Sequence, residues 1–318
     1  MHTLRTWRLA PVAVLCTVAL AACGSSSNNS SSSNTSSSSS SSSTPSTSST
    51  ASTSGSSTGV ASVEALVPAA IKSKGTLTVA ADASYAPNEF IGPDGHTVVG
   101  MDADLSKALG AVMGLKVNVV NATFDTIIPG LSAGKFDMGA SSFTDTKARE
   151  KSVDFVDYFI AGESFFTKAS GGTTISTIAD ICGKTVAVEK GTTEEADAGT
   201  QGKKCKAEGK PGVTVLSFSD QNGANLALSS GRAQLGFADS PVAAYQVKQS
   251  GGQFKLVGAA YANAPYGLAM PKNGLAKAVL AALQQLMSNG TYMQILTKWG
   301  IQSGAIPASQ VKINGATS

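Results

Sequence analysis

The sequence predicts an α/β fold made of two lobes. Short apolar runs typical of buried strands alternate with segments of helical period through residues 76–300, which indicates a mainly parallel sheet flanked by helices. Residues 131–142 (LSAGKFDMGASS) also align without a gap on residues 228–239 (LSSGRAQLGFAD). The folded part, from about residue 60 onward, exceeds a typical single domain. Together these observations predict two similar α/β units.

The first unit begins with residues 76–81 (TLTVAA), which predict a buried strand that ends at Asp82. Residues 102–113 keep apolar side chains at helical spacing, and Gly114 is a natural end for that helix. The remaining predicted elements are a strand at 117–120, a short helix at 124–133 and a strand at 137–140.

The alternation restarts after residues 165–166. The second unit is predicted to contain strands at 185–188, 213–217 and 235–238, a helix from residue 192, and helices at 221–230 and 241–249. A strand at 266–270 and helices near 275–288 and 292–299 form no further complete unit, so we expect them to return to the first lobe. The chain would then cross between the lobes twice, at a hinge.

The N-terminus has the pattern of a secretory signal peptide over residues 1–22. Arg5 and Arg8 precede the apolar run 9–20, which is too short to span a bilayer. Residues 20–23 (LAAC) resemble the bacterial lipobox, which implies cleavage before Cys23 and acylation of its thiol. The alternative is an ordinary signal peptide followed by a chance cysteine.

Residues 23–59 are almost entirely Ser, Thr, Asn and Gly, a composition that predicts a flexible tether. Removal of the signal peptide leaves 22 basic residues against 21 acidic ones, so nothing indicates a nucleic-acid surface. Cys182 and Cys205 remain as an even pair in an oxidising compartment, where a disulfide is expected.

The segment 139–149 (GASSFTDTKAR) carries the most specific chemistry. It is predicted to place two hydroxyls at a strand end and Arg149 one turn into a following helix, an arrangement that suits a carboxylate. In the internal alignment Ser142 corresponds to Asp239, which could accept hydrogen bonds from an ammonium. A strand-to-helix junction at residues 191–193 (GTT) also favours an anion. These parts predict a site that grips an amino acid between the lobes.

Six motifs in this order resemble the polar amino-acid-binding proteins of bacterial ABC importers, solute-binding family 3. They are ADASYAPNEF (81–90), GMDADL (100–105), FDTIIPGL (124–131), GASSFTDTKAR (139–149), GTT (191–193) and GRA followed by Asp239 (231–239). The resemblance, which covers about residues 75–300, implies a type II periplasmic-binding-protein fold with a ligand cleft between two lobes and two hinge crossings. It divides the chain into lobe 1 at 60–164 and 266–302, lobe 2 at 165–265, and a C-terminal tail at 303–318.

The resemblance also implies a set of ligand-binding residues: Asp82, Tyr85, Phe124, Ser141, Ser142, Thr144, Arg149, Thr192, Thr193 and Asp239. Arg149 would clamp the α-carboxylate, with hydroxyls as further donors, although a surface ion pair with Asp145 is the alternative. Asp239 would hold the α-ammonium. Tyr85 and Phe124 would flank the ligand or simply belong to the core.

Two residues of the site have more than one possible role. Asp82 would meet a ligand nitrogen, either on the side chain or at the α-amine, or it would serve as a turn or N-cap residue. Ser141 would orient its neighbour or contact the ligand through its backbone. Asn88 departs from the family pattern, in which Phe is common, and would make the pocket more polar if it faced the ligand.

The resemblance predicts a lipid-anchored, extracytoplasmic protein that captures a polar or cationic L-amino acid for the permease of an ABC importer. We expect a monomer that needs no cofactor or metal, since His96 is the only histidine after the signal peptide. The main rival is a dehydratase-like enzyme on the same fold, with Asp82, Glu89 or Asp239 as general acid. A sensory lipoprotein that signals to a membrane partner is a third reading.

Overall fold

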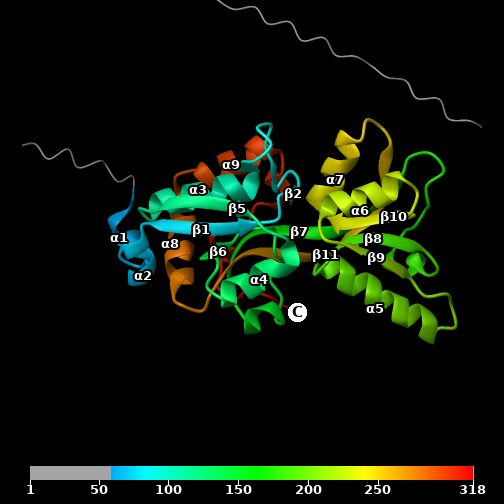
Figure 1. The fold of residues 1–318 in the computed structure, drawn as a ribbon, viewed down its shortest axis with the longest axis horizontal. Helices are drawn as coiled ribbons and strands as arrows, with labels where there is room; N and C mark the ends of the chain where they lie inside the picture. Colours follow the sequence, from blue (N-terminus) through cyan, green and yellow to red (C-terminus); the bar gives the residue numbers. More distant parts are fainter. Residues whose placement is uncertain (1–58, 318) are drawn as a thin grey trace, which may run out of the picture. The chain divides into compact units, whose positions relative to one another are not determined.

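A computed structural model of the protein describes residues 59–317. The predicted signal peptide, Cys23 and nearly all of the tether lie outside these residues. One sheet of eight strands, in the order β5-β1-β6-β11-β7-β10-β8-β9, runs through the described part (Figure 1). None of its helices within residues 59–317 has the length and apolar character needed to cross a membrane.

The first lobe is built on β1 (Thr76–Ala81), which pairs in parallel with β5 (Lys116–Asn121) and β6 (Met138–Gly139). Helix α3 (Met101–Val112) packs against α8 (Leu275–Ser288) and α9 (Thr291–Trp299), so the last helices lie beside elements of the first lobe. Leu77, Leu105 and Leu283 are fully buried in the core that these elements share. Helix α4 (Phe124–Ser132) lies on the other side of the strands from α3 and α9 (Figure 1).

Several small elements of the first lobe were not predicted. They are helices α1 (Ala61–Glu64) and α2 (Ala69–Lys74) and a three-stranded sheet of β2 (Ser84–Tyr85), β3 (Glu89–Ile91) and β4 (Val98–Val99). Each is too short to show a clear hydrophobic period.

The second lobe contains the parallel strands β10 (Leu235–Asp239), β8 (Thr185–Glu189) and β9 (Thr214–Phe218). Helix α5 (Thr193–Ala207) covers one side of them, and α6 (Gln221–Ser229) and α7 (Ser240–Gln249) lie on the other (Figure 1). A disulfide joins Cys182, beside the short helix η2 (Ile178–Ile181), to Cys205 of α5, as the sequence predicts. The loop that it closes contains residues 191–193.

Two long antiparallel strands connect the lobes. β7 (Asp154–Lys168) and β11 (Phe254–Met270) pair along most of their length; β11 meets β6 in the first lobe, and β7 meets β10 in the second. Breaks in their register between Val257 and Ala264 mark the crossing. The predicted lobe boundaries 164/165 and 265/266 fall inside these strands, and the division itself stays a prediction.

The sequence pattern does not reveal how long these strands are. In β7 nearly every residue is buried, whereas most of β11 from Lys255 to Ala264 is exposed. Neither strand therefore shows the alternation of buried and exposed side chains by which a strand is recognised in a sequence. Pairing between the two strands, rather than local pattern, extends them across both lobes.

The C-terminal segment has more structure than the word tail implies. It contains η3 (Gln302–Gly304) and η4 (Ala308–Gln310), and it bridges β7 at Phe159–Ala305 and Val156–Ile313. The segment therefore packs along the first-lobe part of β7.

Candidate functional site

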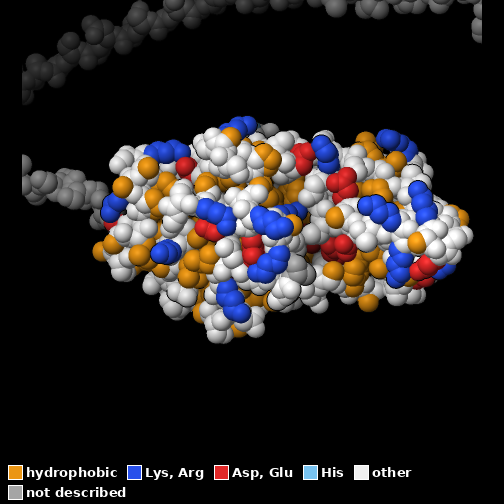
Figure 2. Space-filling model, turned by 90° about the horizontal axis from the view of Figure 1, so that it is seen from below, with side chains coloured by type: hydrophobic (Ala, Val, Ile, Leu, Met, Phe, Trp, Pro, Cys, Tyr) orange, Lys and Arg blue, Asp and Glu red, His pale blue; other side chains and the backbone are white. Residues whose placement is uncertain are grey.

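A small cavity lies between the lobes, at the carboxyl ends of β1 and β8. Its lining contains all ten residues that the resemblance selects: Asp82, Tyr85, Phe124, Ser141, Ser142, Thr144, Arg149, Thr192, Thr193 and Asp239. Glu189 and Glu194 complete the lining. On the face of the molecule in Figure 2, by contrast, basic, acidic and hydrophobic side chains are interspersed.

Arg149 bridges the two lobes. Its Nη1 donates a hydrogen bond to the carbonyl of Thr144 at 2.8 Å, and its Nη2 donates to the carbonyl of Gly191, in the second lobe, at 2.9 Å. The guanidinium carbon lies 5.4 Å from the ring centroid of Phe124. Burial lowers the pKa of Arg149, while Glu194 and Asp239 favour its charged form. Since a guanidinium has five N–H donors, it keeps donors for a further acceptor.

The local backbone at Arg149 differs from the prediction. Arg149 begins the single 3₁₀ turn η1 (Arg149–Lys151) instead of lying one turn into an α-helix. The amide of Asp145 donates to the carbonyl of Pro265 at 2.9 Å, and Thr144 bridges Tyr266, so pairing with β11 keeps the preceding chain extended. The alternative ion pair is absent from residues 59–317, because the Asp145 carboxylate accepts from the amide of Ala316 at 3.1 Å.

The Ser141–Ser142 pair is held from behind by buried acids. Ser141 Oγ and Ser142 Oγ donate to the two carboxyl oxygens of Glu89 at 3.1 and 3.2 Å, and the amide of Ser142 donates to Asp102 at 2.8 Å. Ser142 has a φ of 50°, in the left-handed region. Asn88 is fully buried behind the loop and donates to Ser142 Oγ at 2.9 Å, so it orients the serine and does not line the cavity.

Helix α5 begins at the cavity. Thr192 caps it, since its Oγ1 accepts from the amide of Glu195 at 3.2 Å. The Thr193 hydroxyl lies 3.4 Å from the Thr144 hydroxyl of the first lobe. The first-turn N–H groups and the helix dipole make this end of the cavity favourable for an anion.

Asp239 ends β10 and contacts Tyr85 of the first lobe. The Tyr85 hydroxyl donates to Asp239 Oδ2 at 3.1 Å and accepts from the amide of Asp239 at 3.0 Å. Burial, reinforced by the nearby carboxylate of Glu163, raises the pKa of Asp239 to about 7. Asp239 is therefore a buried acceptor that titrates near neutral pH.

Asp82 combines a capping contact with a place in the cavity. Its Oδ2 accepts from the amide of Phe124, the first residue of α4, at 3.0 Å, and its Oδ1 accepts from Ser84 Oγ at 2.6 Å. Burial raises the pKa of Asp82, and these two hydrogen bonds oppose the rise. Asp82 thus binds the first amide of α4 from outside that helix and also lines the cavity.

The aromatic residues Tyr85 and Phe124 pack in the core and also line the cavity. Phe124 stacks on Phe143 with ring centroids 4.5 Å apart, and Tyr85 packs with Phe166 and Leu228. Both rings are core residues on one side and cavity walls on the other. His96, by contrast, lies exposed in a turn beside Asp94 and does not reach the cavity.

Glu189 and Glu194 were missed from the sequence. Both are 2% exposed, and the Oε1 of each has no hydrogen-bond partner within residues 59–317. Burial raises the pKa of both carboxyl groups. The available signal was their position on either side of the GTT motif. A glutamate at the end of a buried strand, such as Glu189, rarely lacks a partner, so its presence there indicates a site.

Comparisons with known proteins agree with this architecture. The model of bacterial extracellular solute-binding proteins, family 3, matches residues 77–302. The arginine-binding protein ArgT of Corynebacterium glutamicum is 38% identical over 249 residues, which cover 78% of this chain and 81% of that protein. The names of such relatives describe binding proteins and not enzymes.

Two solved structures are similar in fold as well as sequence. The P235GK mutant of ArgBP from T. maritima has a TM-score of 0.66 and 32% identity, covering 72% of this chain and 97% of its own. An ancestral arginine-binding protein bound to arginine has a TM-score of 0.65 and 36% identity, covering 71% and 98%. The predicted two-lobed fold is thereby confirmed, and the chain belongs to the bacterial extracellular solute-binding proteins, family 3.

Proposed function

We propose that this protein captures a cationic L-amino acid, with arginine as the leading candidate, outside the cytoplasmic membrane and delivers it to the permease of an ABC importer. The names of its relatives, several of which are arginine-binding proteins, support the choice of ligand. In this role the protein carries out no catalytic step.

The charge of the cavity carries this proposal. Four carboxyl groups, those of Asp82, Glu189, Glu194 and Asp239, line it together with one guanidinium, that of Arg149. Buried charges need partners of opposite sign. An amino acid with a cationic side chain brings one carboxylate and two cations, and so complements this set better than a neutral or acidic amino acid.

The proposed contacts follow from the two ends of the cavity. Arg149 clamps the α-carboxylate, with the hydroxyls of Thr144 and Thr193 and the start of α5 as further donors. Asp239 holds the α-ammonium, and Asp82 reads the side-chain cation. Tyr85 and Phe124 flank the ligand skeleton, while Ser141, Ser142 and Thr192 shape the loops that carry these groups.

The cellular arrangement is also part of the proposal. Cys23 carries a lipid on the outer face of the membrane, residues 23–59 act as a tether, and the monomer divides into lobe 1 at 60–164 and 266–302 and lobe 2 at 165–265. Cys23→Ser should move the protein from the membrane fraction to the soluble fraction without changing ligand affinity. A variant that stays membrane-bound in cells without the importer would contradict the anchor.

Titration calorimetry on the secreted Cys23→Ser protein tests the ligand. The panel is arginine, lysine, ornithine, histidine, glutamine and glutamate. We expect arginine to bind most tightly, the other cationic amino acids next and glutamate not at all. Tighter binding of glutamine or glutamate than of arginine would overturn the proposed substrate class.

A further inference from the structure

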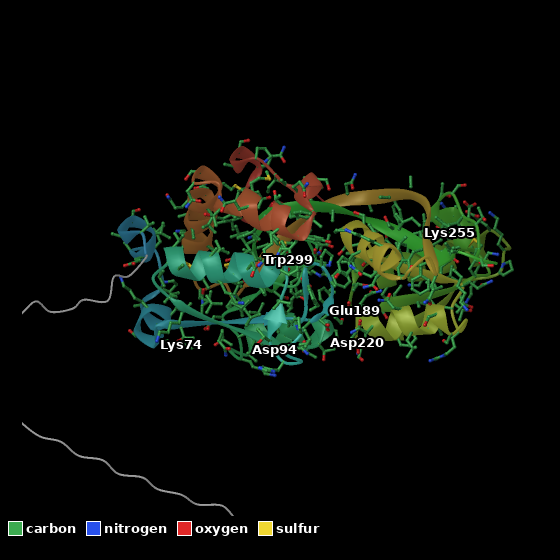
Figure 3. All side chains as sticks on the ribbon, turned by 90° about the horizontal axis from the view of Figure 1, so that it is seen from above. Lys74, Asp94, Glu189, Asp220, Lys255 and Trp299 are labelled. Carbon is green, nitrogen blue, oxygen red and sulfur yellow. A yellow bond between two sulfur atoms is a disulfide. The ribbon has the colours of Figure 1, made fainter. Side chains whose placement is uncertain are left out.

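Two carboxyl groups line the cavity from opposite lobes, that of Asp82 from the first lobe and that of Glu189 from the second. Asp82 follows β1 in the first lobe, where Ser84 and the amide of Phe124 fix its side chain. Glu189 ends β8 in the second lobe, and its side chain lines the same cavity as Asp82. Figure 3 shows Glu189 between the two lobes, close to Asp220.

The surroundings of this pair are acidic. Burial raises the pKa of Glu189, and the carboxyl groups of Asp82, Glu194 and Asp220 raise it further. The charged form of Arg149 is favoured instead by Glu194 and Asp239. Lys190, next to Glu189 in the sequence, points outward and pairs with Asp125 at 2.8 Å. Within residues 59–317, no Lys or Arg is among the groups that contribute most to the pKa shifts of Asp82 and Glu189.

Contacts between the lobes flank the pair. The amide of Gln221, in the second lobe, donates to Ser84 Oγ at 2.9 Å, and Ser84 Oγ in turn donates to Asp82. The Lys190–Asp125 ion pair is a second contact between the lobes. In the conformation with these contacts, the Asp82 and Glu189 side chains line one cavity.

We propose that Glu189 is a specificity-determining residue that makes closure of the lobes conditional on a positive charge between its carboxylate and that of Asp82. This inference rests on the proposed function of the same cavity. It adds that a second carboxylate, from the opposite lobe, must also be neutralised by the ligand before the lobes close. Two buried carboxylates repel each other, so without a cation between them one carboxyl group must take up a proton for the lobes to close. A guanidinium, with its planar fork of donors, can bind both at once and turns the repulsion into attraction.

Citrulline gives a matched test, because it replaces the guanidinium of arginine by a neutral urea group of the same shape. In the Cys23→Ser background, arginine should bind far more tightly than citrulline. Glu189→Gln should weaken arginine by about 30-fold or more, the usual effect of removing one member of a buried charge pair, and should strengthen citrulline. The arginine-to-citrulline preference should therefore collapse.

Two further variants separate charge from folding. Glu189→Asp keeps the carboxylate and should retain a preference for arginine, although with lower affinity for both ligands. Glu208→Gln makes the same chemical change on an exposed residue at the end of α5 and should leave both affinities unchanged. Melting curves of all variants, with and without reductant, check that the second lobe is folded.

Residue-resolved hydrogen exchange reports closure directly. The amides of Gln221 and Asp239 donate to Ser84 and Tyr85 of the opposite lobe, so closure protects them. Without ligand, Glu189→Gln should exchange more slowly at both amides than the parent protein, because closing then requires neither a proton nor a cation at residue 189.

The outcomes distinguish the two proposals. If the parent protein does not bind arginine, the proposed function and this inference both fall. If the parent binds arginine tightly but Glu189→Gln keeps the same arginine-to-citrulline ratio and the same exchange at Gln221 and Asp239, only the role of Glu189 is overturned.

Discussion

Tyr85 and Asp239 exchange two hydrogen bonds across the cavity: the Tyr85 hydroxyl donates to the carboxylate and accepts from the amide of the same residue. One side chain of the first lobe thus holds both polar groups at the end of β10, a strand of the second. Because the two partners belong to different lobes, this contact forms only when the lobes are together.

Tyr85→Phe should weaken every amino-acid ligand by about 1–3 kcal/mol, since it leaves a buried amide and a carboxylate oxygen of Asp239 without their partner. The ranking of ligands should not change, because Asp239 is assigned to the α-ammonium that they share. Calorimetry over the ligand panel measures this effect. Tyr245→Phe, on α7 outside the cavity, is the control; unchanged affinity in Tyr85→Phe would show that the contact does not contribute to binding.

Arg149→Lys should lose most of the affinity for arginine, by about 2–5 kcal/mol. An ammonium cannot donate at once to Thr144, to Gly191 and to a ligand carboxylate with the geometry of a planar fork. Calorimetry, with the melting temperature as a check on folding, decides the outcome. Should Arg149→Ala bind arginine as tightly as the parent, the carboxylate clamp would have to be abandoned.

Asp239 should make binding depend on pH. Its pKa is raised from 3.8 to about 7, so the folded protein holds this proton more firmly than the unfolded chain, and the stability that it contributes is lost as the pH rises from 3.8 to about 7. An ammonium ligand requires the carboxylate. Arginine affinity should therefore fall as the pH decreases below about 7, and binding near that pH should release protons.

Calorimetry in buffers of different ionisation enthalpy counts these protons. Glu163 and Glu194 also face Asp239 and are raised in pKa, so the comparison with Asp239→Asn is needed to assign the effect. This variant should bind weakly at all pH values and lose most of the proton release. Proton release equal to that of the parent would assign the titration to the neighbouring glutamates.

Gly191→Ala should impair closure of the lobes. Gly191 has a φ of 82°, and an added Cβ would lie 2.9 Å from the Cβ of Asp125 in the first lobe. The left-handed backbone adds roughly 1–2 kcal/mol of strain for alanine. Arginine affinity should decrease, and exchange at the amides of Gln221 and Asp239 should quicken.

Gly199→Ala is the matched control, because its Cβ would meet no atom within 4 Å and it lies inside α5. It should stabilise the protein by about 0.5–1 kcal/mol without changing affinity. If Gly191→Ala behaves in the same way as this control, close packing at residue 191 is not needed for binding.

The sequence alone determined the elements whose signal is local. Helix α8 keeps its apolar side chains at helical spacing and matches the predicted 275–288, and β1 matches the predicted 76–81, because a buried strand of six residues reads as a short apolar run. The resemblance then selected ten residues that line one cavity, although their roles in binding stay predictions.

Tertiary structure decided the features that depend on distant partners. The lengths of β7 and β11 come from their pairing with each other, and pairing of Thr144 with β11 replaces the predicted helix before Arg149 by an extended segment. Glu189 entered the cavity only because β8 lies where its end faces Asp82 of the other lobe. No local pattern records which side chains two separate lobes bring face to face, since that is set by long-range strand pairing and by the approach of the lobes.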